Sequence, residues 1–276
     1  MIRKSIYAGR FYPRSHEVVC SRLLHWTGSL LRDPPTQRTI ALVVPHAGYM
    51  YSGAVAARAF HGFGNEKVDT FIILHPSHHT SGFDYSVSPF SRYEGPFSHL
   101  RMDEECFRFF IQGREEESTR MRYHEMEHSM EVLLPMINLY FPGTKVCPLM
   151  LGSQSYQSSM DLAQKIDTLM RQSSQRIVTV VSTDLSHYNH ARKAVAMDGL
   201  LIQKMKDGEI EELWKLACDS VVEACGIGGI LSVMALNKAW PGSKLEILEY
   251  THSGETSGDN SRVVGYLSAR LYLEEE

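Results

Sequence analysis

Cysteine is scarce in this sequence, and its spacing excludes scaffolds built from cysteine. Among 276 residues there are five, an odd number without a Cys-x-x-Cys pair: Cys20, Cys106, Cys147, Cys218 and Cys225. This spacing supports neither a disulfide framework nor a cysteine-rich zinc module. We therefore expect a protein of the reducing cytoplasm.

Long apolar runs and an excess of basic residues are also missing. Nowhere do about eighteen apolar residues follow one another, and Met1–Pro13 has basic residues without a following apolar segment. We therefore expect neither membrane insertion nor export. The formal net charge is −4, and no stretch interleaves Lys or Arg with aromatic residues as a nucleic-acid groove requires. Neither a membrane nor a nucleic acid is an expected partner.

The sequence does contain enough apolar material for a core, arranged in alternating strand-like and helix-like segments. Apolar residues make up 43% of the chain and charged residues 22%, which favours a single domain over residues 1–276. Short runs that are apolar on both faces predict buried strands at Thr39–Val44, Thr70–Leu74, Val146–Leu151 and Ile177–Val181, and the tail adds Leu245–Tyr250 and Val263–Leu271. Helical periodicity predicts Val18–Leu31, Ala54–Phe60, Met130–Tyr140, Met160–Met170, Val195–Met205 and Ile230–Ala239. This order predicts an α/β fold with a mostly parallel or mixed central sheet covered by helices on both faces.

Polar segments follow three of these strands. His46 comes after the first strand, His78 and His79 after the second, and Asp184 and His187 after the fourth. The carboxyl ends of parallel strands share one edge of a sheet, where ligands bind, so we expect these side chains to meet. Imidazole and carboxylate hold borderline transition metals, and two His with one anionic ligand leave positions open for substrate or oxygen.

The anionic ligand has two candidates, Asp184 and Cys225. A carboxylate buried at a strand end is costly unless it is paired or bound to a cation. Cys225 leads into an apolar helix through Gly226–Gly229, and a helix N-terminus or a metal lowers a thiol pKa. A thiolate binds metal or attacks a carbonyl carbon, so Cys225 is a catalytic candidate as well, with His187 as general acid or base. The structural alternatives are helix capping for Asp184 and core packing for Cys225.

Three further residues are candidates for the wall of the cleft. His128 stands at a helix start in Glu127–Glu131, where it either lines the cleft or satisfies a buried donor. His79 adjoins His78, and one of the two is expected to be structural. Tyr49 belongs to the polar segment that follows the first strand.

At these residues the sequence resembles the Memo family, named for an animal protein linked to cell motility. The resemblance spans nearly the whole chain and rests on ordered motifs: Ala8–Pro13, Pro45–Tyr49 with Ser52–Gly53, Pro76–His79, Glu127–Ser129 with Glu131, Ser182–Asp184 with His187, Cys225–Gly226, and the late loop Ser253–Asp259 before Val263–Tyr266. Two positions depart from the pattern. Arg10 stands where the family usually has Ser, and His75 stands where Gly is common, which adds an imidazole near the expected site.

The resemblance implies a fold similar to the catalytic subunit of class III extradiol dioxygenases, which cleave catechol-type rings with non-haem iron held by two His and a Glu. By that resemblance His46 and His78 take the two His places, Cys225 falls at the carboxylate position with Asp184 beside it, and His187 resembles the acid/base His. A thiolate in place of a carboxylate makes the ligand softer and changes the favoured metals. Prokaryotic relatives often neighbour a radical-SAM protein and a small companion protein, which makes both expected partners.

Three functional hypotheses follow. The first is a redox enzyme that holds iron or copper with His46, His78 and Cys225, with or without Asp184, and acts on an unknown small molecule. The second is a metal-free hydrolase in which His187 or His46 activates Cys225. The third is a protein without catalysis that binds a peptide or small ligand at a vestigial site.

Overall fold

The central sheet of this computed structural model, which describes residues 1–29, 31–32, 37–111 and 116–274, is mixed. Its strands follow the order β1-β5-β6-β7-β3-β8-β2-β11-β10. The middle four, β7 (Lys145–Leu151), β3 (Thr70–Pro76), β8 (Ile177–Ser182) and β2 (Gln37–Val44), are parallel. Two antiparallel strands, β11 (Val263–Glu274) and β10 (Lys244–His252), extend the sheet beyond β2. The predicted α/β class is confirmed.

The parallel strands are buried because helices cover both faces of the sheet. Side chains from Ile40 to Val44, from Phe71 to Leu74 and from Val178 to Val181 are fully inaccessible to solvent. A strand covered on both faces can be apolar at every position rather than at alternate ones. This is why the sequence shows short continuous apolar runs at these places.

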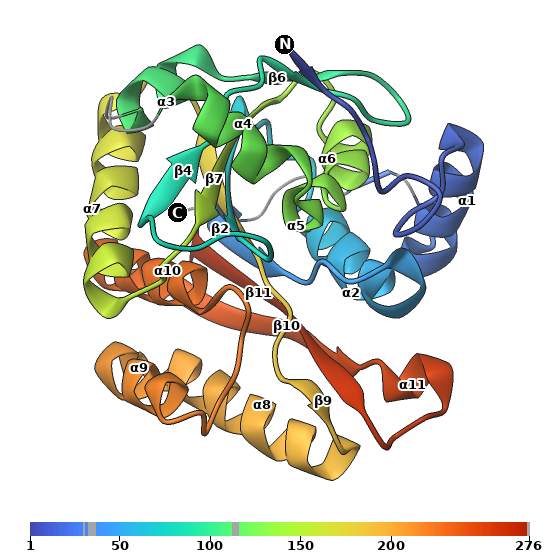
Figure 1. Ribbon diagram of the computed structural model, residues 1–276, viewed down its shortest axis with the longest axis vertical. Helices are drawn as coiled ribbons and strands as arrows, with labels where there is room; N and C mark the ends of the chain where they lie inside the picture. The colour runs from blue at the N-terminus through green and yellow to red at the C-terminus, as the bar shows by residue number, and fades with distance from the viewer. Residues whose placement is uncertain (30, 33–36, 112–115, 275–276) are drawn as a thin grey trace.

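Two groups of helices flank the sheet (Figure 1). On one side α2 (Tyr49–Gly62) packs on β2, β10 and β11, with α1 (His16–Thr27) against it. On the other side α10 (Ile227–Ala239) contacts β8 and β10, α7 (Tyr156–Gln172) packs on α10, and α8 (Ala191–Asp207) packs on β10 and β11. None of the described helices is long and apolar enough to cross a membrane.

Four of the predicted helices, now α2, α7, α8 and α10, are longer than expected, and the other two differ more. α1 ends at Thr27, because Gly28 adopts a left-handed conformation with φ 71° and its N–H caps the Leu24 carbonyl. The predicted helix Met130–Tyr140 is divided into α5 (His128–Glu131) and α6 (Leu134–Tyr140). Pro135 in the first turn of α6 has no N–H to continue a helix from α5 but fits a new helix start.

Several elements had no clear signal in the sequence. Helix α9 (Ile210–Cys218) packs on α8 and α10 and was not predicted. The short elements β4 (Tyr85–Val87), β5 (Arg92–Tyr93), β6 (Leu100–Met102), α3 (Glu104–Phe110), α4 (Glu117–Glu125), β9 (His187–Asn189) and α11 (Gly254–Ser257) were also missed. Most of them are too short for a periodic pattern.

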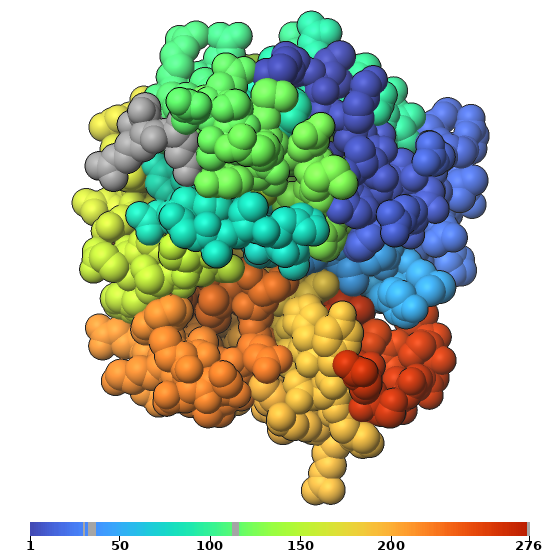
Figure 2. All heavy atoms as spheres, in the orientation of Figure 1, coloured from blue at the N-terminus to red at the C-terminus, as the bar shows by residue number. Residues whose placement is uncertain are grey.

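The N-terminal segment lies beside α4 and α5. Strand β1 (Ile2–Arg3) pairs with β5, and dark blue N-terminal atoms adjoin the green atoms of the α4 and α5 region in Figure 2. The Arg3 guanidinium is buried there and donates to the carbonyl oxygens of His124 and Glu127 at 2.9 and 2.6 Å. It therefore joins the start of the chain to the segment that begins α5.

Candidate metal centre

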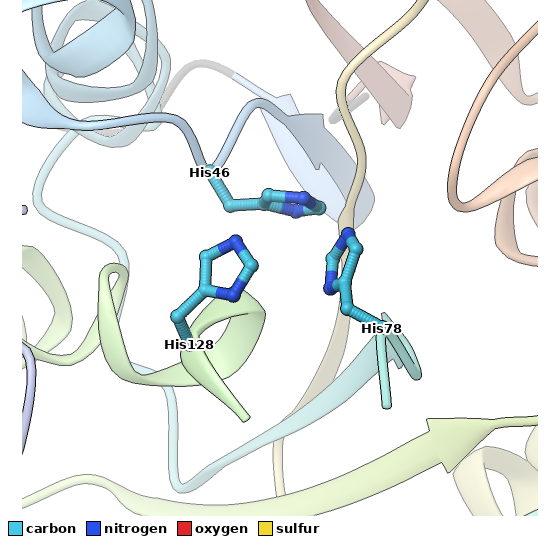
Figure 3. Close-up of side chains that lie close together, drawn as sticks. All are labelled: His46, His78 and His128. Atoms are coloured by element: carbon cyan, nitrogen blue, oxygen red, sulfur yellow. The ribbon is translucent and has the colours of Figure 1, made fainter. Parts of the chain in front are cut away.

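Three adjacent parallel strands bring the predicted polar residues to one edge of the sheet. His46 follows the end of β2, His78 follows the end of β3, and Asp184 follows the end of β8, which lies between the other two. His128 is the first residue of α5. Figure 3 shows the rings of His46, His78 and His128 gathered around a common space.

The three imidazoles form a group that could hold a metal ion. One ring nitrogen from each of His46, His78 and His128 lies within 4.8 Å of the others. The ring centroid of His46 is 5.3 Å from that of His78 and 5.4 Å from that of His128, and the last two are 4.5 Å apart. His46 is buried, His128 is half-buried and His78 is exposed, so the group is open to solvent on one side.

Glu127 sets the orientation of two of these rings. Its Oε1 lies 2.8 Å from His78 Nδ1 and 3.2 Å from His128 Nδ1, and it also accepts the Ser129 N–H at 3.0 Å. Its Oε2 accepts the His78 N–H at 2.8 Å. Burial opposes ionisation of Glu127, but the hydrogen bonds from His128 and His78 outweigh it and hold the pKa of this carboxyl far below its usual range. Because a carboxylate only accepts, both Nδ1 atoms carry protons, and in the neutral ring the free lone pair is then on Nε2.

Ser182 sets the orientation and the protonated nitrogen of the His46 ring. The Ser182 hydroxyl donates to the Ser129 carbonyl at 2.6 Å and lies 2.8 Å from His46 Nδ1. Its single proton is used, so it must accept from Nδ1–H, which leaves the lone pair on His46 Nε2. Burial, with the nearby His78 and His128, lowers the pKa of His46 well below its usual value and keeps the ring neutral.

Asp184 and Cys225 border the group on the side of His46. Asp184 Oδ1 accepts the His46 N–H at 2.9 Å, and its Oδ2 lies 4.0 Å from His46 Nε2. The Cys225 Sγ lies 3.4 Å from His46 Nε2 and accepts the Asp184 N–H at 3.1 Å. Burial raises the pKa of Asp184, and burial together with Asp184 raises that of the Cys225 thiol. Among the described residues neither belongs to the group of mutually close ligand atoms.

The Gln154 side chain, which was not predicted from the sequence, holds the Cys225 loop in place. Gln154 Nε2 donates to the Cys225 carbonyl at 2.7 Å, and its Oε1 accepts the Gly228 N–H at 3.0 Å. Gln154 has a φ of 47°, a conformation that residues other than glycine adopt only when their surroundings impose it. Gly226 closes the loop against β8, since a Cβ there would lie 2.8 Å from the Ser182 carbonyl oxygen.

Loss of these two hydrogen bonds should expose the thiol. In Gln154→Leu the Cys225 carbonyl and the Gly228 N–H lose their partner, which costs about 1–3 kcal/mol and should raise the alkylation rate of Cys225 about tenfold. The rate is measured with iodoacetamide in metal-free protein, with peptide mass spectrometry to separate Cys225 from the exposed Cys218. Gln157→Leu, on the exposed surface of α7, is the matched control. Equal rates in both variants would show that Gln154 does not hold the loop.

The remaining predicted site residues have different surroundings. His187 is half-buried, its N–H donates to Glu223 Oε2 at 3.2 Å, and its charge acts to lower the pKa of Asp184 against the larger effect of burial. His79 is exposed and lies outside the group of three. Tyr49 was expected to line the cleft. Its side chain is buried against Tyr12 and Trp26, and its hydroxyl donates to the Val132 carbonyl at 3.2 Å.

The residues present fit a borderline transition metal. Three imidazoles can each offer the Nε2 lone pair of the neutral ring, and each Nδ1–H is held by an oxygen in the manner typical of histidine ligands. His128 joins the two expected histidines in this group and Glu127 orients two of its rings, whereas Asp184 and Cys225 lie beside His46. The Glu127-His128 pair at a helix start was visible in the sequence, but nothing local showed which way its side chains point.

Glu127 should matter for metal affinity although it is not a ligand in this arrangement. In Glu127→Gln one carboxylate oxygen becomes an NH₂ group that cannot accept from His78, His128 or Ser129. We expect metal affinity to fall about 10–100-fold, as for other residues that orient metal ligands. Competition with a chromophoric chelator measures this change. Glu125→Gln, at an exposed position of α4, is the control, and equal affinities would contradict the role of Glu127.

Sequence comparisons match this chain to known proteins over nearly its whole length. The family model described as Memo-like protein matches residues 3–270. A MEMO1 family protein of Sulfurisphaera tokodaii is 33% identical over 284 residues, covering 98% of this chain and 99% of that protein. Another, from Sulfolobus acidocaldarius, is 34% identical over 286 residues with 98% and 99% coverage. The crystal structure of an uncharacterized protein from Escherichia coli K12 aligns at 12% identity with a TM-score of 0.49, over 84% of this chain and 99% of that one.

Proposed function

The chain belongs to the Memo family, and from this premise we propose that it is a metal-dependent oxidoreductase whose iron or copper ion is held by His46, His78 and His128. Its substrate would be a small molecule that reaches the ion from the exposed side of His78. The fold class and the His group are consistent with the dioxygenase-like site that the sequence motifs imply. The ligand set proposed here differs from the dioxygenase pattern, because a third imidazole stands in for the carboxylate.

One observation carries the proposal. Each of the three Nδ1 atoms lies close to an oxygen that must accept its proton, Glu127 for His78 and His128 and Ser182 for His46. The three free Nε2 lone pairs are therefore fixed before any ion binds, which lowers the cost of ordering the ligands. Imidazole suits iron, copper, nickel and zinc, and three ligands leave positions open for substrate.

The neighbouring groups would have separate roles. An ion at this position supplies Lewis acidity and one-electron chemistry. Asp184 and Cys225, both close to His46 Nε2, would contribute an anionic oxygen or sulfur on that side. His187 is half-buried, lies three residues after Asp184 in the sequence and acts electrostatically on that carboxyl. It would hold or move a proton for the substrate.

The hydrolase alternative has weaker support. A cysteine nucleophile needs a lowered thiol pKa and a nearby base. Burial and Asp184 instead raise the pKa of Cys225, and burial lowers that of His46, which makes it a poor base. The third hypothesis, ligand binding without catalysis, stays a prediction. Partner binding that survives combined loss of His46, His78 and Cys225 would favour it.

Elemental analysis tests the proposal. Protein purified without added metal should contain about one iron or copper ion per chain, and this ion should be lost in the combined variant His46→Ala with His78→Ala. His61→Ala, on the far end of α2, is the matched control. Stoichiometric zinc in place of iron or copper would contradict the redox assignment. Unchanged metal content in the double variant would contradict the site itself.

A further inference from the structure

Two further buried histidines, His75 and His124, contact each other outside the group of three. His75 belongs to β3 and His124 to α4, and both side chains are fully inaccessible to solvent. Their rings make an edge contact, with centroids 5.6 Å apart and planes inclined by 68°. Among the described residues His75 Nε2 and His124 Nδ1 have no hydrogen-bond partner. Buried ring nitrogens are rarely left in this state, so the pair requires an explanation.

The tautomer of His75 follows from Ser129. The Ser129 hydroxyl donates to the Pro76 carbonyl at 3.0 Å and lies 3.0 Å from His75 Nδ1. With its proton already used, this hydroxyl accepts from His75 Nδ1–H. The unpartnered Nε2 of His75 is therefore a free lone pair.

The tautomer of His124 follows from a backbone carbonyl. His124 Nε2 lies 3.1 Å from the carbonyl oxygen of Ser86, which can only accept. The proton is therefore on Nε2, and the unpartnered Nδ1 of His124 is also a lone pair. Two neutral imidazoles in contact thus both present lone pairs, and neither can donate to the other.

We propose that His75 and His124 form a second metal site, which takes the singly charged, soft cation Cu(I) between the two lone pairs. Cu(I) forms linear complexes with two nitrogen ligands, so two imidazoles complete its coordination. His75 is prepared for this role in the way His46 is, by a serine hydroxyl whose proton is committed to a carbonyl. The site goes beyond the proposed function and does not depend on it.

The Arg3 guanidinium, which donates to the His124 carbonyl oxygen at 2.9 Å, opposes a positive charge on both rings, whereas Glu127 favours it, and this balance makes a single positive charge easier to hold than a double one. The carboxylates closest to it have other partners, since Glu131 binds Arg3 at 2.6 Å and Glu127 binds His78 at 2.8 Å. A divalent ion held by two neutral ligands in this buried position would have no anion in contact to offset its desolvation. Zinc, which prefers four ligands, has only two here.

Copper titration of variants without the main centre tests the site. Accessible thiols are first blocked with iodoacetamide, and Cu(I) is then added under anaerobic conditions against a chromophoric chelator. His46→Ala with His128→Ala should still bind about one Cu(I), with the X-ray absorption edge of linear two-nitrogen coordination. Adding His75→Leu or, separately, His124→Phe to this background should remove that ion, whereas adding His16→Phe, an exposed position, should not.

Thermal unfolding keeps the test valid if one variant folds poorly. Cu(I) should raise the Tm of the His46→Ala, His128→Ala protein, because an ion that binds only the folded state stabilises it. The rise should vanish with His124→Phe, which keeps a ring at this position but removes the unpartnered Nδ1 together with the hydrogen bond from Nε2 to the Ser86 carbonyl. The proposal is overturned if the His46→Ala, His128→Ala protein binds no Cu(I), or if its Cu(I) survives both His75→Leu and His124→Phe. A crystal structure of the copper-treated protein with a water molecule donating to both nitrogens would overturn it as well.

Discussion

Replacement of His128 by alanine is expected to abolish stoichiometric metal binding. His128 supplies one of three ring nitrogens that lie within 4.8 Å of one another, and without it only two imidazoles remain to hold the ion. Loss of a direct ligand should exceed the about 10–100-fold loss of affinity that follows from removing an outer partner. Metal content after purification and affinity by chelator competition measure the effect.

His79→Ala provides the matched control, because His79 is exposed, adjoins a proposed ligand and lies outside the group. Its metal content should equal that of the unmodified protein. The informative contrary result is a His128→Ala protein that keeps its metal while Cys225→Ala loses it. In that case the ligands would be His46, His78 and Cys225, the set that the sequence motifs alone imply, and the thiol 3.4 Å from His46 Nε2 would be a ligand.

The convergence of His46, His78 and Asp184 could be predicted from sequence for a clear physical reason. The strands before these residues are apolar at every position because both of their faces are buried, and such strands are parallel. Parallel strands place their carboxyl ends at one edge, so polar residues that follow them meet even when more than a hundred residues separate them. That they lie within contact distance depends in addition on β3, β8 and β2 being neighbours in the sheet.

The role of Glu127 and His128 could not be predicted in the same way. They begin a short helix rather than follow a strand, and their direction depends on contacts with the distant N-terminal segment, such as the bond from Arg3 to the Glu127 carbonyl. Cys225 poses a similar problem, because its loop is positioned by Gln154 and by the close approach of Gly226 to β8. Tertiary contacts of this kind leave no periodic signal in the sequence.

His75 shows how a residue noted in the sequence can have an unexpected position. His75 directly follows the predicted strand Thr70–Leu74 and was expected to add an imidazole near the predicted site. In β3 it lies three residues before His78, and its buried side chain contacts His124 and Ser129 instead. The alternation of side chains along a strand determines which layer each one enters, and this depends on which helices cover each face.

A buried ion pair holds α5, the helix that begins with the proposed ligand His128. The Arg3 guanidinium binds Glu131 Oε2 at 2.6 Å, and both side chains are almost completely buried. The other oxygen of Glu131 accepts from the Tyr7 N–H at 2.8 Å and from the Tyr12 hydroxyl at 2.9 Å. Both oxygens of the Glu131 carboxylate therefore accept hydrogen bonds from buried or half-buried donors.

Glu131→Gln is expected to destabilise the protein by about 3–5 kcal/mol, because it leaves the Arg3 charge buried without its anion. The amide keeps the size of the side chain, but its NH₂ group must face either Arg3 or the donors of Tyr7 and Tyr12. The free energy of unfolding, measured with urea, gives the effect. Glu104→Gln breaks the exposed pair with Arg108 at 2.8 Å and should cost no more than about 1 kcal/mol. If the two variants were equally stable, the buried pair would not anchor α5, and the orientation of Glu127 and His128 would have to come from their own contacts.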